Sequence, residues 1–282
     1  MKKIQVDFWG VRGSVPSPGP ETMRYGGNTS CVSITVENKI LILDAGTGIR
    51  KLGSSIIGNQ NLEIFVTITH SHWDHIQGFP FFIPIYQPRR PVHMFPTVHK
   101  KNVVLASLID QMDGAHFPVT PDQVPSDFNF VTENPLEFLA EKGFNLELIA
   151  MNHPGGAYGY KIRIGKKIIC YFTDNEINPP YKKTIELNDL IKQCHLADIL
   201  IHDAQYIEED MPMKHGWGHS LINEVTDLGI ASEVKNLVYF HHDPERTDDA
   251  LDAELEKAKH MLKKNGSSVI PHFAHEGLKL TL

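Results

Sequence analysis

Short apolar runs rich in β-branched and aromatic residues recur along the chain, and glycine or proline residues separate them. Such runs are typical of β-strands. The chain has 282 residues, of which 41% are apolar, enough to bury the core of one large α/β domain or two small ones. No repeat or linker marks a boundary, so we expect a single α/β domain over residues 1–282. The predicted strands lie at residues 4–9, 31–36, 40–43, 64–69, 146–151, 168–172, 199–201 and 237–240.

The clearest helical spacing lies near the C-terminus. Leu251, Leu255, Ala258 and Leu262 repeat at i, i+4, i+7 and i+11, the pattern of a helix with one buried face. Aspartates crowd its first turns and lysines precede Gly266, as the helix dipole favours. We therefore expect a helix packed on the surface of the domain.

Residues 79–135 differ from the rest of the chain, because many prolines alternate there with aromatic residues. Proline lacks a backbone donor and fixes φ, which predicts loops and short extended pieces. The segment is either an insertion that covers a cleft or an ordinary connection. Its aromatic residues, Phe117 among them, would stack on a nucleobase or pack beneath a loop.

Composition excludes several classes of protein. The net charge of −7 disfavours binding of long nucleic acids, so any phosphate contact must come from a local site. Three widely spaced cysteines exclude a disulfide scaffold. The apolar runs are too short for a membrane span, and Gln5, Asp7 and Arg12 interrupt any secretory signal. A cytoplasmic location without membrane contact is the expectation.

The strongest chemical signal is the motif THSHWDH, which directly follows the apolar run IFVTIT. It places His70, His72, Asp74 and His75 within six residues, as in a loop wrapped around a metal ion. Imidazole and carboxylate ligands suit zinc, manganese or iron, and the lack of a cysteine cluster argues against a structural thiolate site. A chance cluster of surface histidines is the alternative.

Further polar residues close other strand-like runs. His153, Asp174, Asp203 and His241 each come at the end of one. In α/β folds, ligands collect at the carboxyl ends of the strands, where the connecting loops converge. The sequence therefore predicts that the candidate ligands gather at one edge of the sheet, which makes a chance cluster a poor explanation.

These motifs resemble the metallo-β-lactamase superfamily of metal-dependent hydrolases, over nearly the whole chain. HxHxDH marks the superfamily, while GVRGSVPSPG, YGGNTS, LDAGTG, HDAQY, GWGHS and FHHDP are similar to its phosphodiesterase branch. That branch includes the Z-type transfer-RNA endonucleases and bacterial cyclic-nucleotide phosphodiesterases. The resemblance implies an αββα sandwich in a single domain.

The resemblance also implies a dinuclear site with two divalent metal ions. Zinc is expected, although manganese or iron would also suit the ligands. Strand alternation turns neighbouring side chains in opposite directions, so only one of His241 and His242 should face the metals. His241 holds the first position of the matching motif. The implied ligands are His70, His72 and His153 for one metal, Asp74, His75 and His241 for the other, and Asp174 as the bridge.

The implied chemistry is attack on phosphorus by a metal-bridging hydroxide, with Asp74 contributing to catalysis as well as to binding. Asp203 in HDAQY and His219 in GWGHS match a proton-delivery pair of the phosphodiesterase branch. A neighbouring carboxylate favours the protonated imidazole that a general acid requires. The alternative is that His219 caps a helix beginning at Ser220.

The glycine-rich segments near the N-terminus are weaker signals. Arg12, Ser14 and Asn28 could contact a phosphate or brace the metal loops, and tight turns without a ligand role are equally compatible. Asp44 in LDAGTG is interpreted as a supporting or turn-forming residue. His195, His215 and His260 are expected at the surface.

The predicted enzyme is a phosphodiesterase acting on a small or cyclic nucleotide. Only 21 positions separate His153 from Asp174, too few for the protruding arm with which Z-type endonucleases hold transfer RNA. A nuclease acting on RNA or single-stranded DNA ranks second, and a lactone, thioester or β-lactam hydrolase third. A non-enzymatic module is disfavoured because no expected ligand is missing. A homodimer is expected by analogy with homologous hydrolases.

Overall fold

The computed structural model describes residues 2–95, 107–211 and 213–282. The chain divides into two compact units. Unit 1 comprises residues 1–18, 25–135 and 275–282, and unit 2 comprises residues 19–24 and 136–274. The N- and C-terminal segments thus both belong to unit 1, and each unit contains its own sheet.

Unit 1 is built on a seven-stranded mixed sheet with the order β13-β1-β2-β3-β4-β5-β6. Strands β3 to β6 are parallel, whereas β1 pairs antiparallel with both β13 and β2. The first hairpin, β2–β3, is antiparallel. The strands are β1 (Ile4–Gly10), β2 (Cys31–Val36), β3 (Lys39–Leu43), β4 (Glu63–Thr67), β5 (Pro91–Phe95), β6 (Asp127–Phe130) and β13 (Lys279–Thr281).

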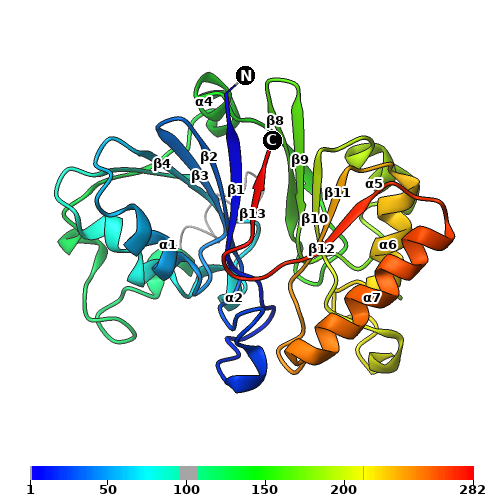
Figure 1. The fold of residues 1–282 in the computed structure, drawn as a ribbon. Helices are drawn as coiled ribbons and strands as arrows, with labels where there is room; N and C mark the ends of the chain where they lie inside the picture. The colour runs from blue at the N-terminus through cyan, green and yellow to red at the C-terminus, as the bar shows by residue number, and fades with distance from the viewer. Residues whose placement is uncertain (1, 96–106, 212) are drawn as a thin grey trace. The chain divides into compact units, whose positions relative to one another are not determined.

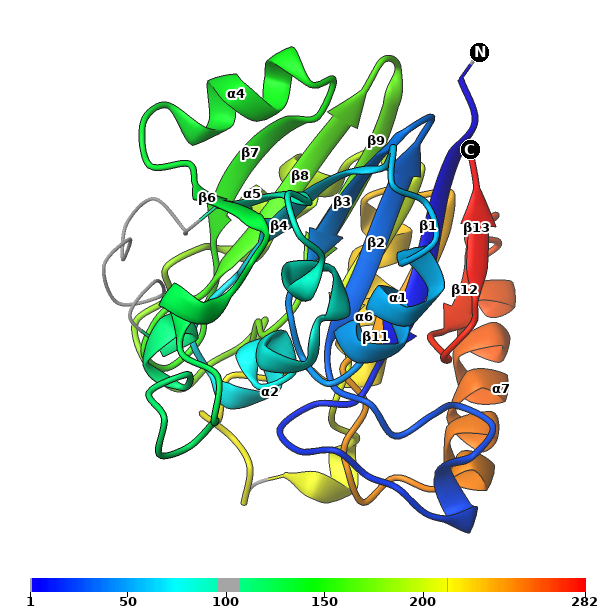
Figure 2. The same cartoon turned by 90° about the vertical axis from the view of Figure 1, so that its left-hand side faces the viewer.

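Helices cover one face of this sheet, as Figure 2 shows for α1 (Ile49–Ile56). Leu52 of α1 packs with Ile42 and Val66 of the sheet in one buried apolar cluster. The short helix α2 (Trp73–Ile76) contributes Ile76 to the same cluster. The loop between β4 and α2, which contains the histidine-rich motif, is therefore fixed at both ends by buried apolar contacts.

Unit 2 contains a six-stranded sheet with the order β12-β11-β10-β9-β8-β7. Strands β9 to β12 are parallel, whereas β8 pairs antiparallel with both β7 and β9. The strands are β7 (Asn145–Ala150), β8 (Tyr158–Ile164), β9 (Lys167–Phe172), β10 (Ile199–Asp203), β11 (Asn236–Phe240) and β12 (Ile270–Phe273).

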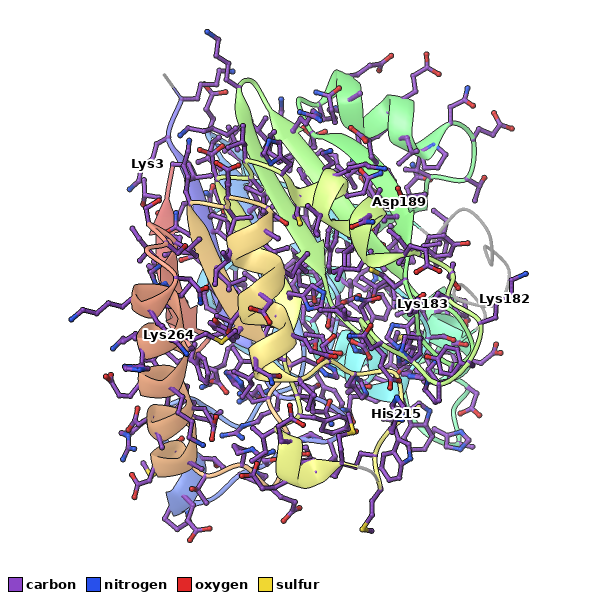
Figure 3. The ribbon with its side chains drawn as sticks, turned by 90° about the vertical axis from the view of Figure 1, so that its right-hand side faces the viewer. Lys3, Lys182, Lys183, Asp189, His215 and Lys264 are labelled. Atoms are coloured by element: carbon purple, nitrogen blue, oxygen red, sulfur yellow. The ribbon has the colours of Figure 1, made fainter. Side chains whose placement is uncertain are left out.

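The helices of unit 2 lie along one face of its sheet (Figures 1 and 3). They are α5 (Leu187–Cys194), α6 (Ile222–Ala231) and α7 (Asp248–Lys264), while α4 (Pro135–Glu141) precedes β7. The predicted C-terminal helix is confirmed as α7. Thr247 caps its N-terminus by accepting a hydrogen bond from the Ala250 amide, and its last residue, Lys264, is marked in Figure 3.

The segment 79–135 is more regular than its prolines suggest. Two of its extended pieces are β5 and β6, which pair in parallel and form one side of the unit 1 sheet. Turns of 3-10 helix at Phe79–Phe81 and Ile83–Tyr86 pack against the core of the same unit. Residues 96–106 lie outside the described part, and a cleft-covering role for the segment stays a prediction.

Within the described residues, no helix is both long enough and apolar enough to cross a bilayer.

Candidate active site

The histidine-rich motif lies in unit 1, in the loop after β4 and in the first turn of α2. Its imidazole rings converge: the ring centroid of His70 lies 4.5 Å from that of His72 and 4.3 Å from that of His75. His70, Asp74 and His75 are buried, while His72 is exposed. The Nε2 atom of His75 lies 3.3 Å from Oδ2 of Asp74. One loop thus brings four candidate ligands together, as the sequence predicts.

Asp44 orients part of this loop from the end of β3. It is fully buried, and its φ of 64° lies in the left-handed region that side chains rarely adopt. Its carboxylate accepts a hydrogen bond from the Thr69 amide at 2.7 Å and lies 2.9 Å from Nδ1 of His75. Fixing Nδ1 in this way directs Nε2 of His75 toward Asp74, as carboxylates do for metal-binding histidines. These are the contacts expected of a supporting residue.

The residues proposed near the N-terminus brace unit 1. The Ser14 amide donates a hydrogen bond to Oδ2 of Asp74 at 2.8 Å. Arg12 is fully buried, and its Nε donates to the Gly26 carbonyl at 2.9 Å. Asn28 donates to Oε1 of Glu276 from both its backbone amide and its side chain. Bracing of the metal loop therefore has direct geometric support at Ser14, while contact of these residues with a substrate stays a prediction.

Phe117 packs edge-to-face against Phe81, with 5.3 Å between the ring centroids. It is half-buried against the apolar cluster of unit 1. This is the packing alternative for the aromatic residues of the segment 79–135. Stacking of Phe117 on a substrate base stays a prediction.

Unit 2 brings two histidines to opposite oxygens of one carboxylate. Nε2 of His241 lies 3.3 Å from Oδ1 of Asp174, and Nε2 of His153 lies 3.8 Å from Oδ2 of the same residue. All three side chains are buried at the ends of strands β11, β9 and β7. Two imidazoles and a carboxylate placed in this way could hold a divalent cation. Asp174 and His241 also have positive φ values of 50° and 61°, so the backbone is strained at both positions.

Hydrogen bonds to Nδ1 set the direction of both rings. Oε1 of Gln205 lies 2.9 Å from Nδ1 of His241, and the Gly218 carbonyl lies 3.1 Å from Nδ1 of His153. Sequence reasoning did not single out Gln205 or Gly218. Gln205 lies in the motif HDAQY and Gly218 in GWGHS, two motifs on which the family resemblance rests. Their position within these motifs is the sequence signal that could have identified them.

Asp203 and His219 form a buried pair in unit 2. Nδ1 of His219 lies 2.7 Å from Oδ2 of Asp203. The amides of Gln205 and Asn175 donate to the two oxygens of Asp203, at 3.0 and 3.2 Å. Helix α6 begins at Ile222 with Leu221 as its cap, so the alternative that His219 caps a helix at Ser220 is wrong.

The adjacent histidines 241 and 242 point in different directions, as strand alternation predicts. His241 approaches Asp174, whereas Nε2 of His242 lies 2.8 Å from the Ala274 carbonyl and its ring stacks on Phe273. The assignment of His241 rather than His242 as a metal ligand stays a prediction. His195, His215 and His260 are exposed, as expected.

Burial shifts the pKa values of two residues beside the Asp203–His219 pair. Complete burial lowers the pKa of His202, whose Nδ1 lies 2.6 Å from the Asp203 carbonyl. Burial raises the pKa of Tyr206, and the charge of Asp203 adds to the effect. The Tyr206 ring meets the His219 ring edge-on, with 5.5 Å between centroids. Both groups thus stay uncharged beside the pair near neutral pH.

The donor set in each unit fits a divalent metal ion. Within unit 2, ligand atoms of Asp203, His219 and His241 lie within 4.8 Å of one another. The donors are imidazole nitrogens and carboxylate oxygens, which zinc, manganese and iron all accept. Several of the imidazoles have Nδ1 fixed by a hydrogen bond, as metal-binding histidines require. These clusters could therefore hold metal.

A family model described as a β-lactamase superfamily domain matches residues 40–242. The chain belongs to this superfamily. Among curated relatives, Ribonuclease Z of Staphylococcus carnosus (strain TM300) is 23% identical, over 84% of this chain and 88% of that protein. The superfamily assignment makes the chain a metal-dependent hydrolase.

Solved structures show the same fold over the whole chain. The metallo-β-lactamase fold protein YhfI from Bacillus subtilis matches with a TM-score of 0.68 and 16% identity, covering 100% of both chains. A structure described as a new diphosphatase from the PhnP family matches with a TM-score of 0.70 and 17% identity, covering 100% of this chain and 98% of that one. The chain therefore has the single-domain α/β metallo-β-lactamase fold that its sequence predicts.

Proposed function

We propose that this hydrolase cleaves small or cyclic nucleotide phosphodiesters at a dinuclear metal centre. The observation that carries the proposal is the 2.7 Å contact between Nδ1 of His219 and Oδ2 of Asp203. Phosphodiester hydrolysis expels an alkoxide, which needs a proton, whereas metal ligands alone supply none. A buried carboxylate–imidazole pair beside the ligand His241 meets that need, since the rings of His219 and His241 stack at 5.0 Å.

The ligand roles are those that the resemblance to the superfamily implies, and coordination of two metals by these residues is part of the proposal. When bound, two divalent cations would supply a hydroxide nucleophile near neutral pH and would stabilise the charge that develops in an in-line displacement at phosphorus. Zinc is the first metal to test, followed by manganese and iron. The ligands would be His70, His72 and His153 for one cation, Asp74, His75 and His241 for the other, and Asp174 for both.

The remaining residues would transfer a proton to the leaving group or hold the ligand side chains in position. Asp203 holds the Nδ1–H of His219 and stabilises the imidazolium, so that Nε2 carries the proton that passes to the leaving oxygen. Gln205 and the Gly218 carbonyl keep His241 and His153 in one ring orientation. The Ser14 amide holds Asp74 in the same way. Each of these contacts is already formed in the structure, which lowers the reorganisation that catalysis requires.

Two observations favour a small substrate. The net charge of −7 is unfavourable for a long polyanion. The connection between β8 and β9 is a tight hairpin, with the turn between Ile164 and Lys167, so the described chain between His153 and Asp174 has no arm.

RNA is the second candidate substrate, because curated relatives carry the name Ribonuclease Z. Cleavage of a labelled oligonucleotide, followed as a function of salt, tests it. Multiple phosphate contacts would give a steep loss of binding with increasing salt. A homodimer is proposed only by analogy, and light scattering on the purified protein decides it.

The primary test is a substrate screen with the zinc- and manganese-loaded protein. We expect turnover of cyclic AMP, cyclic GMP or bis(p-nitrophenyl) phosphate, with little cleavage of a labelled transfer-RNA precursor. The control is the same protein treated with a chelator and then reloaded. Efficient cleavage of the RNA alone would replace the first candidate by the second.

A further inference from the structure

Glu176 is a buried carboxylate in unit 2, two residues beyond Asp174, and only 2% of its surface is exposed. Its two oxygens accept hydrogen bonds from two backbone amides of one loop. Oε1 accepts from the Gly216 amide at 2.8 Å, and Oε2 accepts from the Gly218 amide at 2.9 Å. Nε2 of His215 lies 3.7 Å from Oε1. A carboxylate that is buried with two amide donors is a strong, charge-assisted anchor.

The anchored loop touches two of the proposed site residues. His219 directly follows Gly218, and the Gly218 carbonyl accepts the hydrogen bond of His153 Nδ1 at 3.1 Å. A Cβ atom at position 218 would lie 2.2 Å from that nitrogen, so the loop backbone is seated directly against the ring. The positions of His153 and His219 therefore depend on how firmly this loop is held.

The backbone of the loop needs such an anchor. Gly216 and Gly218 have φ values of 91° and 97°, which glycine adopts readily and other residues rarely adopt. Glycine also loses more conformational entropy than any other residue when the chain becomes ordered. The beginning of the loop is tied separately, because Nζ of Lys214 lies 2.7 Å from Oδ2 of Asp243 and 4.8 Å from the centroid of the Tyr206 ring. Glu176 holds the end of the loop that leads into His219.

We propose that Glu176 is a positioning residue for proton delivery, with its carboxylate clamping Gly216 and Gly218 so that His219 is aimed at the leaving oxygen. The inference rests on the proposed phosphodiesterase function. Trp217, the residue between the two clamped glycines, is 60% exposed, so its indole can report on the loop.

The test compares leaving groups. A p-nitrophenolate leaves without a proton, whereas the alkoxide of a cyclic nucleotide needs one. Glu176→Gln keeps one acceptor oxygen and replaces the other by a donor, so one amide loses its partner. At equal metal content, measured by elemental analysis, we expect kcat to fall about tenfold or more on a cyclic nucleotide and less than about threefold on bis(p-nitrophenyl) phosphate.

His219→Ala serves as the reference, because it should show the same selectivity more strongly. The matched control is Glu186→Gln, at a carboxylate whose side chain is 68% exposed beside Lys183, a lysine marked in Figure 3. We expect this control to leave both activities unchanged. Equal losses on both substrates, or no loss on either, would overturn the positioning role of Glu176.

Amide hydrogen exchange on the wild-type protein tests the clamp independently of folding of the variants. The Gly216 and Gly218 amides should be strongly protected, and quenching of Trp217 fluorescence by acrylamide should increase in Glu176→Gln or, if that variant does not fold, in Glu176→Asp. Unprotected amides in the wild type would refute the clamp. If the wild type cleaves neither substrate while its amides are protected, the phosphodiesterase proposal fails and the clamp stands as a structural feature without the proton-delivery role.

Discussion

Nδ1 of His219 lies 2.7 Å from Oδ2 of Asp203, and this contact joins two motifs that are 16 positions apart in sequence. A face of the His219 ring stacks on the His241 ring, with 5.0 Å between the ring centroids. The pair thus has a fixed orientation beside a proposed metal ligand. The proposed function divides two tasks within unit 2: Asp174, His153 and His241 would bind metal, and Asp203 and His219 would transfer protons.

Replacing His219 by alanine should lower kcat on cyclic nucleotides about 100-fold or more, because general acid catalysis contributes about that factor. Asp203→Asn keeps the size of the side chain but removes the charge that stabilises the imidazolium, so a smaller loss in the same direction is expected. Steady-state kinetics and elemental analysis on the same samples check both. Loss of metal from either variant would assign these residues to the metal site instead.

His241 and His242 provide a matched pair for the metal assignment. His241→Ala should lose metal and activity, because Nε2 of His241 approaches Asp174. His242→Ala removes the contact with the Ala274 carbonyl and the stacking on Phe273, so we expect a loss of about 1–3 kcal/mol in stability with metal content retained. Elemental analysis and thermal unfolding distinguish the two outcomes. The reverse pattern would mean that the neighbouring histidine is the ligand.

Asp44→Asn should weaken metal binding about 10- to 100-fold, which is the usual effect of losing a group that orients a ligand histidine. Asparagine tolerates the φ of 64° at this position, so the change acts mainly on the hydrogen bonds to His75 and Thr69. Asp7→Asn, at another buried aspartate of unit 1, is the control. Competition with a chelator measures the affinity, and equal affinity in the two variants would contradict the role of Asp44.

Apolar runs were sufficient to predict the buried strands, and helical spacing was sufficient to predict α7. Strands β3, β4, β10 and β11 are almost wholly buried and therefore read as continuous apolar runs. The strands that were missed carry weaker signals. β8 contains Lys161 and Arg163 within an alternating pattern, and β6, with the sequence DFNF, is only partly buried.

The candidate site was predictable where chemistry is concentrated in motifs. The histidine-rich loop and the Asp203–His219 pairing followed from residue type and family resemblance. The roles of Gln205 and Gly218 depend on backbone positions and distances that no spacing encodes, since one partner is a carbonyl group. The positive φ values of Asp44, Asp174 and His241 were not predicted either. Aspartate and histidine are enriched at positive φ, but the great majority of both have negative φ, so residue type alone is too weak a signal.

The buried thiols should make stability sensitive to alkaline pH. Burial raises the pKa of Cys194 to about 11 from a reference value of 9.0, so the folded state binds this proton more tightly than the unfolded state does. The free energy of unfolding that this raised pKa contributes is fully present below pH 9 and is lost as pH rises toward 11. Denaturant unfolding across this window checks the trend against Cys194→Ser. A stability that stays constant for the wild type up to pH 11 would contradict it.

Gly218→Ala tests whether the loop and the His153 ring are in direct contact. A left-handed φ alone costs an alanine about 1–2 kcal/mol. Position 218 adds a steric clash, because a Cβ atom there would lie 2.2 Å from Nδ1 of His153, whereas a Cβ at Gly165, with φ of 59°, meets nothing within 4 Å. Gly165→Ala should therefore lose stability only, while Gly218→Ala should also displace the His153 ring and weaken metal binding. Thermal unfolding and metal titration on both variants decide the matter, and the contact is refuted if their metal affinities are the same.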